Sequence, residues 1–342
     1  MNLLSSTSVF GFYTLVSRVL GYLRDILIAI FLGTSIYADA FFVAFRLPNT
    51  FRRLFAEGTF NAAFIPSYTE EKIKGKKSGK KFADEIFSLL LFFLILLIII
   101  IEIFTPFLVY LIAPGFFENT EKFNLAIEFT RITFPFLLFV SLSSLLSGIL
   151  NTNNKFAAAA AAPIILNIVL IFFLLISFYY NHSIAKSLSI GVTLAGILQF
   201  IILIIFTKSF YVPSIKFIFK FSKAIKNFFK KLLPSIFASG ITQINILVGT
   251  IIASFQSGAV SYLYYADRVY QINLAIAGIA VGTVALPNLA KSIKLNDKFS
   301  TNQIQNKSIE LSLLFSIPAT FGLLIASNQI VNSLFGYGSF DI

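Results

Sequence analysis

The sequence lacks cysteine altogether, has a single histidine and is poor in charged residues. Of its 342 residues, 12% are charged and 57% are hydrophobic, and this charged share is about half of that expected in a soluble domain. Without cysteine there can be no disulfide, and one histidine, His182, cannot build a zinc site of the cysteine and histidine type. These absences predict neither a metal site nor a cofactor.

Long apolar runs dominate what is present. Residues 86–113, 157–180 and 184–207 each exceed the length of about 20 residues that a membrane-crossing helix needs. The N-terminal stretch is interrupted by Arg18 and Arg24, which is unlike a signal peptide and favours a first span. We predict an all-α polytopic membrane protein with nine complete spans, near 3–33, 37–66, 84–112, 125–150, 157–180, 184–207, 232–255, 259–290 and 308–326.

The lysines gather in four connections between these spans. With the N-terminus in the cytoplasm, the cytoplasmic connections 67–83, 151–156, 208–231 and 291–307 hold 18 of the 20 lysines, and Lys122 is the one lysine of an outer connection. The positive-inside rule therefore predicts a cytoplasmic N-terminus. This placement explains the net charge of +12 without a nucleic acid partner.

The arginines follow a different distribution, because all seven fall within the predicted spans or at their ends. An arginine at the centre of a bilayer costs about 2.5–3.5 kcal/mol, so several of them must face a polar interior. Only arginine offers a planar, always charged fork that binds phosphate through two hydrogen bonds. The spans therefore predict a cavity that binds an anion. The arginines are Arg18, Arg24, Arg46, Arg52, Arg53, Arg131 and Arg268.

The second predicted span carries a polar stripe. At 100° per residue, one helix face would hold Asp39, Arg46, Asn49, Arg53 and Glu57. The stripe would extend over about 27 Å, nearly the whole hydrocarbon thickness. Intrahelical ion pairs that brace a bundle are an alternative interpretation. The first two spans contain five arginines and only three acidic residues, and this excess of cations favours an anionic ligand.

Three segments carry a resemblance to a known family. They are SRVLGYLRD at 17–25, YADAFFVAFRLPNTFRRLFAEGTFNAAFIPSY at 37–68 and SYLYYADRVYQ at 261–271. In these segments the chain resembles the MurJ (MviN) lipid II flippases of the MOP exporter superfamily. The resemblance implies a bacterial inner membrane protein that moves lipid II, the undecaprenyl-pyrophosphate-linked disaccharide-pentapeptide, outward for peptidoglycan synthesis, cell wall biogenesis and cell shape.

The resemblance also implies a cationic central cavity that holds the pyrophosphate and sugars. By motif, the substrate-binding residues would be Arg18, Arg24, Asp25, Asp39, Asn49, Arg52, Arg53, Glu57, Ser261 and Arg268. We expect Arg24, Arg52, Arg53 and Arg268 to form a pyrophosphate clamp shared between two lobes.

The organisation expected from the resemblance has two lobes. Residues 1–207 would form an N-terminal lobe of six spans, 208–231 a cytoplasmic amphipathic linker on the inner leaflet, and 232–342 an incomplete second lobe of three spans and the start of a fourth. A solvated linker is the alternative for 208–231. Members of the family have about 14 spans, so the chain is expected to be truncated at its C-terminus. Some members of the family bind sodium through an acidic residue of the seventh span. The corresponding span here, 232–255, has no acidic residue, so we predict no sodium coupling.

The residues of the sequence favour transport over catalysis as the function of the chain. An enzyme would need a nucleophile or a metal with general acid and base groups, whereas here arginines outnumber acidic residues and the one histidine is peripheral. We expect a monomer whose partners are lipid II and bilayer lipids. The alternative is a related MOP exporter of another lipid-linked glycan.

Overall fold

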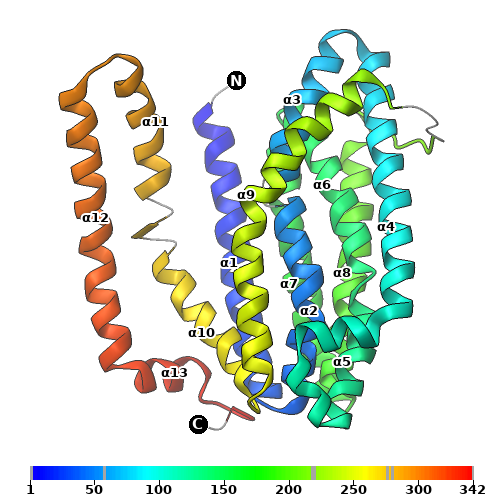
Figure 1. Ribbon diagram of the computed structural model, residues 1–342, viewed down its shortest axis with the longest axis vertical. Coiled ribbons are helices and arrows are strands. Elements are labelled where there is room, and N and C mark those ends of the chain that lie inside the picture. Colours follow the sequence, from blue (N-terminus) through cyan, green and yellow to red (C-terminus); the bar gives the residue numbers. More distant parts are fainter. Residues whose placement is uncertain (1–2, 57–58, 217–220, 275–276, 279–280, 341–342) are drawn as a thin grey trace.

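The described residues fold mainly into helices, which confirms the all-α class. The structure, a computed structural model, describes residues 3–56, 59–216, 221–274, 277–278 and 281–340, and no strand occurs within these ranges (Figure 1). The helices are α1 (Leu3–Leu32), α2 (Ile36–Ala56), α3 (Thr59–Ile73), α4 (Lys76–Ile112), η1 (Pro114–Glu118), α5 (Thr120–Thr133), α6 (Phe136–Thr152), α7 (Phe156–Tyr179), α8 (Ile184–Thr207), α9 (Lys223–Ser254), α10 (Ala259–Asn273), α11 (Val281–Lys294), α12 (Lys298–Ile325) and α13 (Ser327–Phe335).

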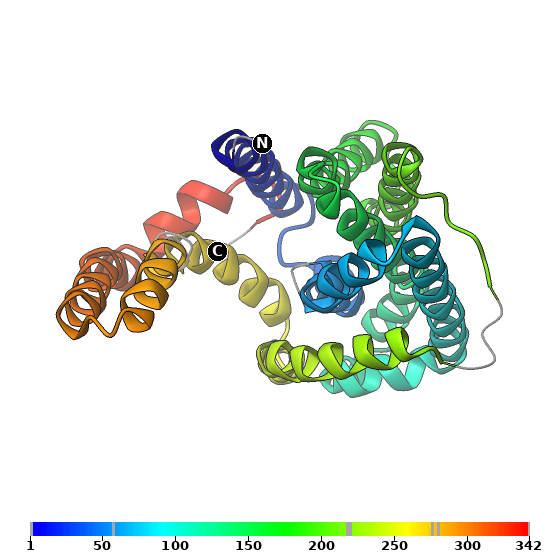
Figure 2. The ribbon, with the colours of Figure 1, turned by 90° about the horizontal axis from the view of Figure 1, so that it is seen from above.

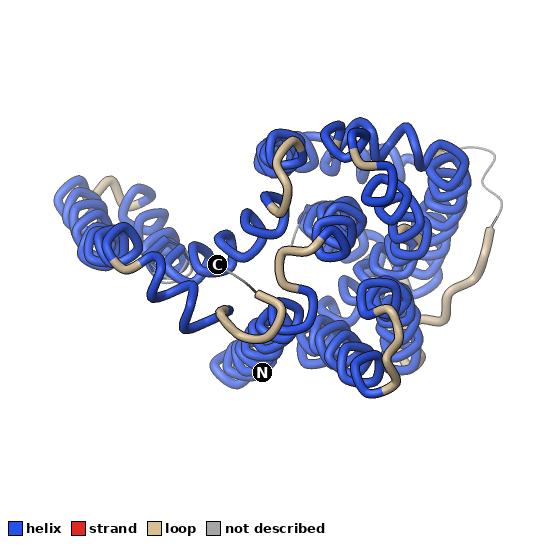
Figure 3. The backbone as a smooth tube through the Cα atoms, turned by 90° about the horizontal axis from the view of Figure 1, so that it is seen from below, coloured by secondary structure: helices blue, strands red, loops and turns tan. Residues whose placement is uncertain are grey.

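Two groups of helices flank α1. Helices α2 to α8 pack into one bundle, and α9 crosses its side, while α10, α11 and α12 extend away on the other side of α1 (Figure 2). Figure 3 shows the same arrangement from below, with the described residues in helices and loops. The most extensive helix contacts join α1 to α7, α7 to α8 and α2 to α5. Helix α1 is therefore fixed to the bundle by α7.

The two ends of the molecule differ in their charge. The turns between α3 and α4 and between α11 and α12 lie at one end, with the start of α9 (Figure 1). We call this the lysine-rich end, because Lys72, Lys76, Lys223 and Lys298 lie there. The α1–α2 turn, η1, the α9–α10 turn and α13 lie at the other end (Figure 1), which we call the opposite end. The predicted cytoplasmic connections thus share one end of the fold.

Several predicted spans match observed helices closely. The spans 157–180 and 184–207 correspond to α7 and α8 within one residue. Among the described residues, five helical stretches are long and apolar enough to cross a membrane: Lys76–Ile112, Thr120–Thr152, Phe156–Tyr179, Ile184–Thr207 and Lys298–Ile325. The number of nine spans stays a prediction.

Other predicted spans are divided. The span 125–150 becomes α5 and α6, which meet at Pro135, a residue without the N–H that an unbroken helix would use. The span 37–66 becomes α2 and the start of α3, and residues 57–58 between them lie outside the described residues. The periodicity of an apolar run does not reveal such breaks.

The segment predicted as an amphipathic linker, 208–231, is described except for residues 217–220, and the linker stays a prediction. The helix begins only at Lys223, where the Ser222 side chain accepts a hydrogen bond from the backbone N–H of Ile225. It then continues as α9 through Ser254. The apolar side chains Ile225 and Phe228 are buried against α3 and α4 in a cluster with Phe64. These two side chains therefore pack on protein, whereas Phe221 is 52% exposed.

Candidate functional site

A side chain of the apolar helix α7, Asn167, positions Arg24. Asn167, buried in α7, donates from Nδ2 to the Ser17 carbonyl at 2.8 Å and accepts from Arg24 Nη1 at 2.8 Å. Gly21 lies beside this amide, and a Cβ there would be 3.5 Å from the Asn167 side chain, an ordinary van der Waals contact. The amide thus ties one turn of α1 to α7 and holds the Arg24 guanidinium in place.

A buried carboxylate, Asp25, lies at the centre of the site. Arg24 donates to Asp25 Oδ1 from Nη2 at 2.6 Å and from Nε at 3.0 Å. Tyr264 donates its hydroxyl to the same oxygen at 2.9 Å. Arg268 Nε lies 2.9 Å from Oδ2, as an ion pair rather than an aligned hydrogen bond. We call Arg24, Asp25, Asn167, Tyr264 and Arg268 the Asp25 cluster.

Tyr264 links three helices within this cluster. Its ring stacks on Phe42 of α2 with a centroid distance of 3.9 Å. The Arg268 guanidinium lies over the same ring, with its Cζ 4.6 Å from the ring centroid. It also donates from Nη2 to the Tyr264 hydroxyl at 2.8 Å. Cation–π and charge-assisted contacts of this kind strengthen when water is excluded. The Asp25 cluster therefore joins α1, α2, α7 and α10.

The charges of the Asp25 cluster do not balance. Two guanidiniums face one carboxylate, which leaves one formal positive charge. The side chains of Arg24 and Asp25 are 8% and 2% exposed, whereas that of Arg268 is 19% exposed. Arg268 is thus the member of the cluster that an anion can approach without first opening the contact between α1 and α7.

A second buried carboxylate, Asp39, lies at the opposite end. Its Oδ1 accepts from the Ser261 hydroxyl at 2.6 Å and from the Ser261 backbone N–H at 2.9 Å, and its Oδ2 accepts from the Gly258 N–H at 3.0 Å. Lys122 Nζ of α5 lies 2.5 Å from Oδ2. Asp39 therefore caps the first turn of α10, where free N–H groups and the helix dipole favour an anion. We call Asp39, Lys122, Gly258 and Ser261 the Asp39 cluster.

The chain segment after α13 packs beside this end of α1. Ser339 donates its backbone N–H to the Ile30 carbonyl at 2.7 Å. Gly33 has a left-handed φ of +55°, and a Cβ there would come within 1.9 Å of the Ser339 carbonyl oxygen. Tyr265 donates its hydroxyl to the Gly33 carbonyl at 3.1 Å and packs against the buried Phe340 ring. Helix α10 and residues 335–340 thus both contact the α1–α2 turn.

The predicted site residues fall into separate groups. Arg24, Asp25 and Arg268 meet in the Asp25 cluster, while Asp39 and Ser261 meet at the opposite end. Arg52 donates from Nε to Asn49 Oδ1 at 2.9 Å within α2. The remaining three are Arg18, which is exposed on α1, Arg53, whose backbone lies in α2 and whose side chain is outside the described residues, and Glu57, which is itself outside them. A clamp of four arginines stays a prediction.

Sequence reasoning missed four members of these clusters, which are Asn167, Tyr264, Lys122 and Gly258. Two signals were available. Asn167 is the only amide in the apolar run 157–180, and a buried amide in such a run needs a hydrogen-bonding partner. Tyr264 precedes Arg268 by four residues, a spacing that places both on one helix face. Nothing in the local pattern distinguishes Lys122 from a lysine of a solvated loop.

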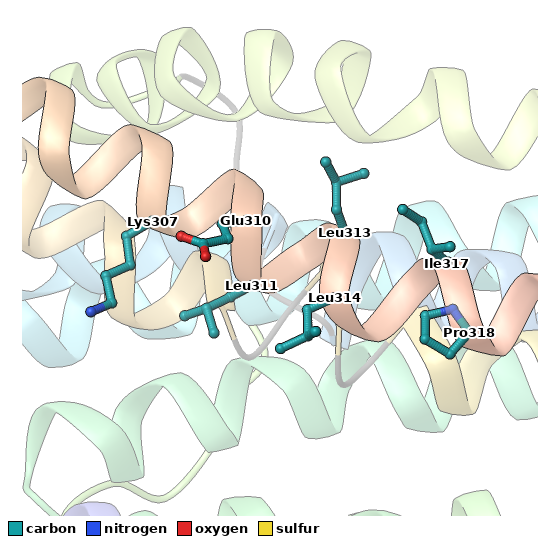
Figure 4. Close-up of a pocket in the computed structure, with 7 residues that line it drawn as sticks. All are labelled: Lys307, Glu310, Leu311, Leu313, Leu314, Ile317 and Pro318. Carbon is teal, nitrogen blue, oxygen red and sulfur yellow. The ribbon is translucent and has the colours of Figure 1, made fainter.

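Other candidate sites are absent or shallow within the described part of the chain. No group of three or more acidic or histidine side chains there could hold a metal ion. A shallow cavity of about 400 Å³ lies along α12, lined by Lys307, Glu310, Leu311, Leu313, Leu314, Ile317 and Pro318 (Figure 4). All its lining residues come from one helix whose apolar stretch contains no buried residue, as expected of a surface that faces lipid or other helices. It contains none of the predicted site residues.

Comparison with known proteins assigns the family. The family model described as "Lipid II flippase MurJ" matches residues 28–342. The chain belongs to the lipid II flippase MurJ family. A probable lipid II flippase MurJ of Rickettsia prowazekii (strain Madrid E) is 41% identical over 340 residues, which cover 99% of this chain and 67% of the relative. The chain spans about two thirds of the length of the curated MurJ relatives that it matches.

Two solved structures share the fold of this chain. A lipid II flippase MurJ in an inward closed conformation superposes with a TM-score of 0.82 at 31% identity, covering 97% of this chain and 68% of that one. An inward-facing MATE family transporter of the MOP superfamily gives a TM-score of 0.73 at 13% identity, covering 94% of this chain and 73% of that one. The latter similarity supports the fold alone. The predicted MOP-type helical bundle is confirmed.

Proposed function

We propose that this chain transports lipid II from the cytoplasmic to the outer leaflet of a bacterial inner membrane by alternating access. Membership of the MurJ family supports a transporter rather than an enzyme and supports lipid II as the substrate. One observation carries the mechanism: arginines from α1 and α10 share a single buried carboxylate. Helices far apart in the chain are thereby joined through charge.

In this proposal, Asp25 occupies the place of an anion while no substrate is bound. A pyrophosphate has more negative charge and more acceptor oxygens than one carboxylate, so it competes for Arg268 and then for Arg24. Both guanidiniums can offer two parallel hydrogen bonds to it. As Arg268 turns from Asp25 to the substrate, the ion pair between α1 and α10 is released. The hydrogen bond of Tyr264 to Asp25 is then the remaining link within the cluster, and its loss lets the two groups of helices move apart.

The arrangement of the lobes follows the same proposal. Residues 1–207 act as one lobe and 232–342 as part of the second, joined by 208–231. The lysine-rich end faces the cytoplasm with the N-terminus, as the positive-inside rule requires, and the opposite end faces outward. The substrate-binding set is the one predicted from the sequence, with Arg52 and Arg53 beside Arg24 and Arg268 as the clamp. We propose that the chain works as a monomer.

Replacement of arginine by lysine tests the mechanism. In a strain depleted of its own lipid II flippase, the chain should restore growth, and Arg24→Lys and Arg268→Lys should lose most of this activity because lysine keeps the charge but not the fork. Arg131→Lys, at an exposed position of α5, is the matched control and should keep full activity. Undiminished activity of both cluster variants would refute the bidentate contact.

The cargo is tested separately. Vesicles containing the purified chain should move fluorescent lipid II between leaflets. Movement of another undecaprenyl-linked glycan, with lipid II left in place, would favour a related exporter of that glycan.

A further inference from the structure

Lys122 is buried although the sequence places it in an outer connection. It lies in the first turn of α5 with its side chain 6% exposed. Its ammonium is held between the Asp39 carboxylate at 2.5 Å and the Phe116 ring, whose centroid is 4.1 Å away. A buried ammonium is costly unless it has a partner of opposite charge. Lys122 is therefore an internal part of the fold rather than a solvated loop residue.

The partner of Lys122 is shared with the other group of helices. Besides Lys122, Asp39 accepts three hydrogen bonds, and all three come from Gly258 and Ser261 at the start of α10. The backbone of η1 also lies close to the end of α9. Gly115 of η1 donates its N–H to the Ser254 hydroxyl at 3.1 Å. A Cβ on Gly115 would meet the Ser254 carbonyl oxygen at 2.4 Å. The α9–α10 corner is thus closed against α2, η1 and α5.

We propose that Lys122 is a positioning residue of the outer gate, which neutralises and orients Asp39 so that this carboxylate can cap α10 when the opposite end closes. The inference rests on the proposed alternating access. Closure removes water from both charges, so Asp39 depends on Lys122 most strongly in the closed state. When the corner separates, Asp39 loses the donors of α10, and water replaces them. In this open state, the ion pair between Lys122 and Asp39 is exposed to water and contributes little to stability.

Loss of Lys122 should therefore favour the open outer gate. The chain contains no cysteine, so a single cysteine can report on opening. Val260, next to Ser261, is fully buried in the closed corner. In vesicles containing the full chain with Val260→Cys, a membrane-impermeant maleimide added outside should label the thiol at a rate set by gate opening.

We expect Lys122→Met to raise this labelling rate by at least about tenfold, because methionine keeps the apolar stem but leaves Asp39 without its counter-charge. Lys122→Arg keeps the charge and should remain close to the parent rate. Asp39→Asn should also raise the rate. The double variant Asp39→Asn with Lys122→Met should label more slowly than the product of the two single effects predicts, since it removes both charges together.

Two further reporters separate gating from unfolding. Val192→Cys, fully buried in α8, should stay unlabelled in every variant. Ser257→Cys, exposed in the α9–α10 turn, should react at the same rate in all of them. An unchanged labelling rate of the Val260→Cys reporter in Lys122→Met, or equal labelling of the α8 reporter, would overturn the proposal. The labelling requires no lipid II, so a failure of transport with the expected labelling would count against the proposed function alone.

Discussion

Arg268 and Asp25 form an ion pair, with Nε 2.9 Å from Oδ2, that connects α10 to α1. Arg24 contacts the other oxygen of the same carboxylate at 2.6 Å. The repulsion between the two arginines is therefore offset by the one aspartate that pairs with both. This relationship makes Asp25 as important to the proposed mechanism as either arginine.

Asp25→Asn should destabilise the chain and make it more responsive to phosphate anions. Removal of one partner of a buried ion pair costs about 3–5 kcal/mol, and here it leaves two guanidiniums without their shared counter-charge. Inorganic pyrophosphate should then raise the melting temperature of Asp25→Asn more than that of the parent, because the anion occupies the place of the carboxylate. Thermal unfolding in detergent with and without pyrophosphate measures both effects.

Glu128→Gln is the matched control for this prediction. Glu128 pairs with Lys186 on the surface, where both side chains are about half exposed, and an exposed pair of this kind contributes only about 0–1 kcal/mol. Its melting temperature should stay near that of the parent. An equal response of Asp25→Asn and the parent to pyrophosphate would contradict the idea that Asp25 stands in for an anion.

Asn167→Leu should weaken both the fold and transport. The substitution removes a second hydrogen bond from the Ser17 carbonyl, which is also a backbone acceptor within α1. It leaves one Arg24 N–H without its buried partner, which costs about 1–3 kcal/mol. It also frees the Arg24 guanidinium to turn. Denaturation and the lipid II movement assay measure the two consequences. The neighbouring Ile168→Leu, at an exposed position of α7, should leave both unchanged, and an Asn167→Leu variant with normal transport would show that the amide does not position Arg24.

Gly33→Ala should displace residues 336–340 from the end of α1. Alanine at φ +55° is strained, and its Cβ would lie 1.9 Å from the Ser339 carbonyl oxygen, a backbone atom that cannot rotate away. The thiol of a Phe340→Cys reporter, at a position buried in the parent, should then react with maleimide several times faster than in the chain with Gly33. Gly322→Ala on α12, where a Cβ meets no atom within 4 Å, should have no such effect. Equal rates in all three proteins would show that the contact at Gly33 is dispensable.

Much of the fold could be predicted from the sequence because membrane-crossing helices are specified locally. The runs that became α7 and α8 are apolar over their whole length, and each satisfies its own backbone hydrogen bonds. The break between α5 and α6 has a local cause in Pro135, yet its consequence depends on neighbours, since prolines such as Pro163 lie inside continuous helices.

The candidate site was only partly predictable. The sequence predicts that Arg24, Asp25 and Arg268 lie inside the helical bundle, because charges within apolar runs must find polar surroundings. Their partners do not follow, since Asn167 and Tyr264 reach them only after α1 packs on α7 and α10. Asp39 shows the same limit: its place in a polar stripe suggested a shared cavity, whereas the structure pairs it with Lys122 and the first turn of α10.

The sequence by itself determined that this chain is helical and apolar and that its arginines lie within or at the ends of apolar spans, because these properties depend on residue type and local spacing. The tertiary structure alone decided which charges meet. Lysine and arginine side chains are long and flexible, so the position of a residue in the chain does not say whether its charge ends in water, against a ring or on a buried carboxylate. The partners of Lys122 and Arg268 are Asp39 and Asp25, which lie on helices from distant parts of the chain.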